Sequence, residues 1–121
     1  MKKQSNLSIN VEMDENHIPE SISWESDDID ENIKKKAEAA MLFFWDKADN
    51  NAMSLNLWTK DMSIEEMSKF YFQIIMTMAD SFEKATNEDQ MALALRDFAD
   101  FFGEKMGVIS PTGKFAGNQD I

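Results

Sequence analysis

The chain has 121 residues, of which 43% are hydrophobic, with no cysteine and a formal net charge of −11 at pH 7. This length is typical of one domain, and no apolar run approaches the roughly 20 residues of a membrane-spanning helix. The lack of cysteine excludes disulfides and thiol chemistry, while the acidic balance disfavours nucleic acid and anionic lipid, which bind basic patches.

The N-terminal segment lacks the features of a secretion signal. Gln4, Ser5 and Asn6 follow the basic start Met1-Lys2-Lys3, at the point where a signal peptide has its apolar region. We therefore expect a cytoplasmic protein with no membrane insertion.

The acidic residues are concentrated near the N-terminus. Between Glu12 and Glu31 there are nine acids and no Lys or Arg. The rest of the chain holds the other 14 of the 23 acids and all 12 bases, so it is nearly neutral. A segment of this kind either binds a basic partner or is a solvated loop that keeps the protein soluble. The sequence leaves both interpretations open.

Period-two alternation predicts strands in the first half of the chain. Residues 7–13 alternate apolar and polar side chains, and residues 21–25 do so again after Pro19. The stretch 33–45 is ambiguous, because its lysines and alanines favour helix while its aromatic end favours a buried strand. We expect a short helical or irregular stretch near 31–38, and then a hairpin that pairs 41–46 with 52–59 across a polar turn.

The second half predicts two amphipathic helices. Ser63 and Glu66 have the spacing of a capping box, and apolar residues recur at helical spacing from there to about residue 85. A second helix follows from about Asn87 to Met106, with Gly107 at the usual stop position. The expected fold is α+β, with an antiparallel sheet of about four strands packed on one face by two C-terminal antiparallel helices. Residues 1–107 would form a single domain and 108–121 a flexible C-terminal tail.

The residues offer little support for catalysis or metal binding. His17 is the only histidine and lies in an acidic loop without a nucleophile motif. A calcium-loop pattern begins at Asp28 but fails at Ile33, where glycine is needed, and at Ala39, where a bidentate glutamate is needed. Asp61 and Asp80 are the carboxylates among apolar neighbours, and both suit ordinary turn or helix positions. We expect no enzymatic activity, no cofactor, no metal and no catalytic residue.

Aromatic and methionine side chains are the more informative excess, with thirteen aromatics and ten methionines. Some of these side chains lie off the main apolar faces of the predicted helices and strands. They form either a second buried face or an interface with a partner or a second copy. Together with the acidic run and the residues after the hairpin, they give our candidate partner-binding set: Trp24, Trp58, Lys60, Asp61, Phe72, Asp27, Asp28 and Asp30.

Several blocks of the chain resemble the GldC family of gliding motility proteins. They are Asp14-Glu15-Asn16 with Ile18-Pro19-Glu20, Ile22 and Trp24; Trp45-Asp46; Leu57-Trp58-Thr59-Lys60-Asp61-Met62; and Met78-Ala79-Asp80-Ser81-Phe82 with Ala85-Thr86. The resemblance implies an accessory protein of gliding motility without enzymatic activity. Our first hypothesis is therefore a non-catalytic interaction protein that supports gliding and its associated secretion machinery, with an unidentified protein partner and a possible homodimer. The alternative is a small-ligand-binding module with a pocket between sheet and helices.

Overall fold

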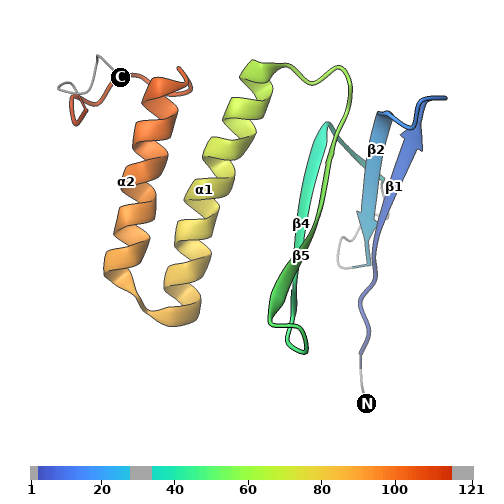
Figure 1. Ribbon diagram of the computed structural model, residues 1–121, viewed down its shortest axis with the longest axis horizontal. Coiled ribbons are helices and arrows are strands. Elements are labelled where there is room, and N and C mark those ends of the chain that lie inside the picture. The colour runs from blue at the N-terminus through green and yellow to red at the C-terminus, as the bar shows by residue number, and fades with distance from the viewer. Residues whose placement is uncertain (1–2, 28–33, 116–121) are drawn as a thin grey trace. The chain divides into compact units, whose positions relative to one another are not determined.

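The computed structural model describes residues 3–27 and 34–115 and has the α+β composition that the sequence predicts (Figure 1). The chain divides into two compact units, Met1–Met62 and Ser63–Ile121. Among the described residues, the first unit contains five strands and the second contains two helices.

Three strands form the first antiparallel sheet, in the order β1-β2-β3. They are β1 (Leu7–Met13), β2 (Pro19–Ser26) and β3 (Lys35–Ala37). The register places Ile9 opposite Trp24 and Val11 opposite Ile22, which gathers the apolar residues on one face of the sheet. Ile22 is only 1% exposed. The alternation in residues 7–13 and 21–25 therefore marked two real strands.

The expectation of a helical or irregular stretch near 31–38 is wrong for Lys35–Ala37, which forms β3. Residues 31–33 lie outside the described part of the chain. The strand pairs with β2, and Ala37 lies opposite the buried Ile22. Pairing with a neighbouring strand outweighs the modest helix preference of lysine and alanine, because intrinsic propensity is a weak term.

The predicted hairpin is confirmed as β4 (Ala39–Asp46) and β5 (Asn51–Trp58). Its turn is held by the Asp46 carboxylate, whose Oδ1 accepts hydrogen bonds from the N–H groups of Ala48 at 3.0 Å and Asp49 at 3.3 Å. Five strands thus form two sheets where we expected about four strands in one. Only Glu38 separates β3 from β4, yet β3 pairs with β2 and β4 pairs with β5.

The second unit is an antiparallel pair of helices, α1 (Ile64–Thr86) and α2 (Asp89–Lys105). The capping box is confirmed, since Ser63 Oγ accepts from the Glu66 N–H at 3.1 Å and the Glu66 side chain accepts from the Ser63 N–H. Asn87 ends α1 in the left-handed conformation, with φ of 59°. Small buried side chains allow the two helices to approach closely: Ala79, Ala92 and Ala99.

Residues 108–115, within the segment that we expected to be a tail, make contacts along α2. The N–H of Val108 donates to the Gly103 carbonyl at 2.7 Å. Lys114 Nζ lies 3.0 Å from Asp97 Oδ1 and 2.9 Å from Asp100 Oδ2, and these carboxylates raise the pKa of Lys114, with Asp100 the larger influence. The Phe115 ring meets the Phe101 ring edge-on, with the centroids 5.3 Å apart.

Candidate functional site

The turn between β1 and β2 is built around the Asp14 side chain. Its Oδ1 accepts hydrogen bonds from the N–H groups of Asn16 at 2.8 Å and Ile18 at 3.0 Å, and the Asp14 N–H donates to the Ile18 carbonyl. His17 completes the turn in the left-handed conformation, with φ of 62°. These donors stabilise the ionised carboxylate, so the pKa of Asp14 is lowered, first by the Ile18 N–H and also by Asn16 and Lys60.

Lys60, just beyond β5, joins this turn to the end of the hairpin. Its backbone N–H donates to the Pro19 carbonyl at 3.1 Å. Its ammonium lies 3.3 Å from Glu20 Oε1 and 3.5 Å from Asp14 Oδ2. The Asp14 side chain is only 14% exposed, whereas Lys60 and Glu20 are about half exposed. The hydrogen bond and charge of Glu20, with a smaller influence from Asp14, raise the pKa of Lys60.

Thr59 is a buried residue that holds the same end of β5 in place. It is 1% exposed, and its Oγ1 donates to Glu38 Oε2 at 2.5 Å while its N–H donates to the Glu38 carbonyl at 2.8 Å. A buried hydroxyl with a carboxylate acceptor is well satisfied and holds the local backbone in one position. Because Thr59 lies between them, the backbone of Trp58 and Lys60 is held in position as well.

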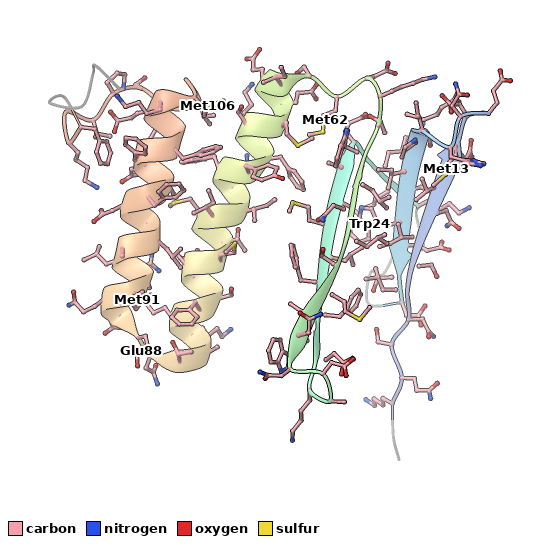
Figure 2. The ribbon with its side chains drawn as sticks, in the orientation of Figure 1. Met13, Trp24, Met62, Glu88, Met91 and Met106 are labelled. Atoms are coloured by element: carbon pink, nitrogen blue, oxygen red, sulfur yellow. The ribbon has the colours of Figure 1, made fainter. Side chains whose placement is uncertain are left out.

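A shallow hollow of about 380 Å³ opens beside these anchors. We call it the Trp58 hollow. The turn end of β1, marked by Met13 in Figure 2, contributes one side of it, and the end of β5 contributes the other. Its walls are mainly apolar, with one ammonium, one imidazole and one side-chain amide: Met13, His17, Ile18, Pro19, Asn56, Leu57, Trp58 and Lys60.

The hairpin that leads to the hollow exposes large apolar side chains on both faces. Because residues opposite each other in the register share a face, Phe44 and Met53 lie on one face and Phe43 and Trp45 on the other. Trp45 is 65% exposed and Trp58 54% exposed. Exposed aromatic side chains therefore lie along the whole hairpin, and Trp58 is the one among them that lines the hollow.

Of the candidate residues that the structure describes, two lie together in the Trp58 hollow, Trp58 and Lys60. Trp24 is half-buried on β2 (Figure 2), and Asp61 is exposed in the loop before α1. Asp27 accepts hydrogen bonds from both the N–H and the side-chain amide of Asn6. Asp28 and Asp30 lie outside the described residues.

Phe72 belongs to the helical unit, where its ring packs against α2. A Cβ atom added at Gly103 would lie 2.8 Å from Phe72 Cε1, so the glycine leaves room for the ring. Asp80, noted in the sequence for its apolar surroundings, pairs with Arg96 of α2 at 2.9 Å. Arg96 also meets Glu83 at 2.8 Å and lowers the pKa of Glu83. These residues tie α1 to α2.

Sequence reasoning missed Asp14, His17 and Glu20 as parts of the site. His17 was considered only as a catalytic residue, whereas the structure places it in the wall of the hollow. The sequence offered one indication of these residues. Asp14-Glu15-Asn16 and Leu57–Met62 are two of the blocks that carry the resemblance to the GldC family. Their contact through Lys60 gives a structural reason for both blocks.

Within residues 3–27 and 34–115, no cluster of three or more His, Asp or Glu side chains is arranged to hold a metal ion. Over the same residues, neither helix has the length and apolar character required to cross a bilayer.

Comparison with known proteins identifies one family. The family model described as gliding motility-associated protein GldC-like matches residues 19–108, which include Leu57–Met62 and both helices. No curated protein and no solved structure matches the chain. The match covers most of the sequence and agrees with the resemblance noted from its motif blocks. The chain therefore belongs to the GldC-like family of gliding motility-associated proteins.

Proposed function

We propose that this protein is a non-catalytic accessory protein of gliding motility and its associated secretion machinery, which works in the cytoplasm by binding another protein at the Trp58 hollow. Family membership supports the motility setting. The observation that carries the binding site is the exposed Trp58 beside an apolar hollow whose wall is anchored by Thr59 and Lys60. Tryptophans on rigid supports are frequent energetic centres of protein interfaces.

The charges around the hollow indicate what kind of segment would bind. Lys60 is accompanied by Asp14 and Glu20, so these three groups sum to one negative charge, and the whole chain carries −11. A partner segment with an apolar side chain for the hollow and a basic residue for the exposed Glu20 carboxylate would complement this surface. Such complementarity favours rapid association and disfavours acidic partners.

The protonation states support a binding role over acid-base catalysis. A general acid or base works best when its pKa lies near the operating pH. At this site the pKa of Asp14 is lowered and that of Lys60 is raised, so both groups are held in their charged forms near neutral pH. These ions suit a fixed electrostatic surface.

A complementation experiment in the native host tests this proposal. A strain that lacks the gene would be supplied with the wild-type protein, with Trp58→Ala, or with Trp45→Ala as a matched control. Both tryptophans are exposed on the same hairpin, but only Trp58 lines the hollow. We expect Trp45→Ala to restore colony spreading and Trp58→Ala to fail at an equal protein level. Equal restoration by both variants would contradict the assignment of the site.

A further inference from the structure

The outer edge of β5 lacks the features that protect edge strands. Among the described strands, β5 pairs only with β4. Residues 51–59 contain no charged residue and no proline, and the β4–β5 register shows no bulge. Proteins normally protect an open edge with charges, proline or a bulge, because unpaired N–H and C=O groups recruit another strand. This edge is therefore suited to strand pairing.

The hydrogen-bond pattern shows which backbone groups face that edge. The Thr59 N–H donates to the Glu38 carbonyl on the β4 side. Because hydrogen bonding alternates along an antiparallel strand, the even-numbered residues of β5 direct their N–H and C=O groups to the outer edge. Lys60 agrees with this pattern, since its N–H donates to Pro19 of β2. Pro19 therefore covers the edge at Lys60, and no described strand pairs with the outer edge of the stretch from Ala52 to Trp58.

We propose that β5 pairs antiparallel with β5 of a second copy of this chain, centred on Leu55, so that two hairpins form one four-stranded sheet. In this register Leu55 meets the partner's Leu55, and Met53 meets the partner's Leu57. Ser54 meets the partner's Asn56, a pair of side chains that already hydrogen-bond along the strand at 3.3 Å. Apolar residues thus face apolar ones and polar residues face polar ones, as stable cross-strand pairs require.

Charge favours β5 over β4 as the pairing edge. Two chains of net charge −11 repel each other, so an uncharged strand is where they approach at least cost. The equivalent pairing of β4 with its own copy, centred on Leu42, would set Glu38 against the partner's Asp46 on both sides of the axis. Like charges directly opposite in a sheet are destabilising. The inference concerns the backbone of β5 and does not depend on the Trp58 hollow binding a partner.

Ser54→Pro tests the pairing edge in the full chain. Residue 54 faces outward in the ladder, so proline removes an outer N–H and blocks a neighbouring strand while the β4 ladder keeps its bonds. Sedimentation equilibrium of the wild type should give twice the mass of the chain, and Ser54→Pro should lose the dimer. Circular dichroism would check that the variant retains its fold. A monomeric wild type, or a dimer that survives Ser54→Pro in folded form, would overturn the proposal.

A cysteine placed at the symmetry axis tests the register without disturbing the edge. The native chain has no cysteine, so Leu55→Cys offers one thiol per copy. In the proposed register the two residues form a close cross-strand pair, within reach of a disulfide. Mild oxidation should convert Leu55→Cys into a covalent dimer and leave Phe43→Cys, an exposed position on β4, without a covalent crosslink. Absence of the Leu55→Cys dimer, or equal crosslinking at both positions, would contradict the β5 interface.

Discussion

Lys60 Nζ lies 3.5 Å from Asp14 Oδ2, which ties the residue after β5 to the turn between β1 and β2 across 46 positions of the sequence. The two residues act in different ways. Asp14 organises its turn through backbone N–H groups, and Lys60 attaches the hairpin to that turn through Asp14, Glu20 and the Pro19 carbonyl. The Trp58 hollow exists because these two pieces meet.

Loss of the Asp14 charge should weaken the fold in a pH-dependent manner. The pKa of Asp14 is lowered from 3.8 in the folded chain, so its contribution to stability is present above that value and is lost as the pH falls through the folded pKa. Urea unfolding from about pH 6 to about pH 3 should therefore show Asp14→Asn to be less stable than wild type near neutrality, with the gap narrowing below about 3.8.

Lys60→Met separates the two causes of that lowered pKa. The hydrogen bond from the Ile18 N–H is the largest influence on Asp14, and Lys60 is a smaller one. We therefore expect Asp14→Asn to lower the free energy of unfolding in the Lys60→Met background as well. The loss there should be most of the loss that Asp14→Asn causes in the wild type. A cost that disappears with Lys60→Met would show that the ion pair, and not the turn, controls Asp14.

The backbone conformation of His17 should tolerate glycine and resist branched side chains. Its φ of 62° is strained for most residues and free for glycine. His17→Val should lower the free energy of unfolding by about 1–2 kcal/mol, while His17→Gly should leave it nearly unchanged. Chemical denaturation of both variants provides the measurement, and equal losses in the two would contradict a role for the left-handed conformation.

Gly103→Ala should destabilise the helix pair through Phe72. The added Cβ would lie 2.8 and 2.9 Å from two Phe72 ring atoms and 3.0 Å from Ile109 Cγ1. Crowding of this kind costs about 1–3 kcal/mol, and the better helix propensity of alanine offsets roughly 1 kcal/mol of it. Thermal or urea unfolding should thus report a loss of about 1 kcal/mol.

A double-mutant cycle identifies the contact responsible for that loss. In a Phe72→Ala background the ring is absent and only the Ile109 contact remains, so most of the cost of Gly103→Ala should disappear. The same cost in both backgrounds would mean that the ring is not what the new methyl group meets.

Local patterns predicted the elements well. The alternation of residues 7–13 and 52–59 marked strands because each places apolar side chains on one face, and Ser63 with Glu66 marked the start of α1 through a local capping box. β3 was missed because its lysines and alanine carry no strand pattern of their own. It is a strand only because β2 lies beside it, and that pairing is tertiary.

The site was less accessible from the sequence than the fold. Trp58 and Lys60 stood out as an aromatic and a charged residue at the end of a predicted strand. The contribution of Asp14, His17 and Glu20 depends on a turn that meets the far end of a hairpin, at residues 56–60, more than 30 positions later. No periodicity in the sequence encodes that contact. The division of five strands into two sheets was hidden for the same reason, since it depends on a change of pairing partner at Glu38.

Photo-crosslinking in the native host tests most directly whether the Trp58 hollow binds a protein partner. A photoreactive phenylalanine analogue would replace Trp58, or Trp45 as the control, since both positions are exposed on the hairpin and only the first lines the hollow. We predict a discrete adduct with a different protein from position 58 and none of that mass from position 45. An adduct equally strong at both positions, or no adduct with a different protein at position 58, would contradict the binding of a protein partner at the Trp58 hollow.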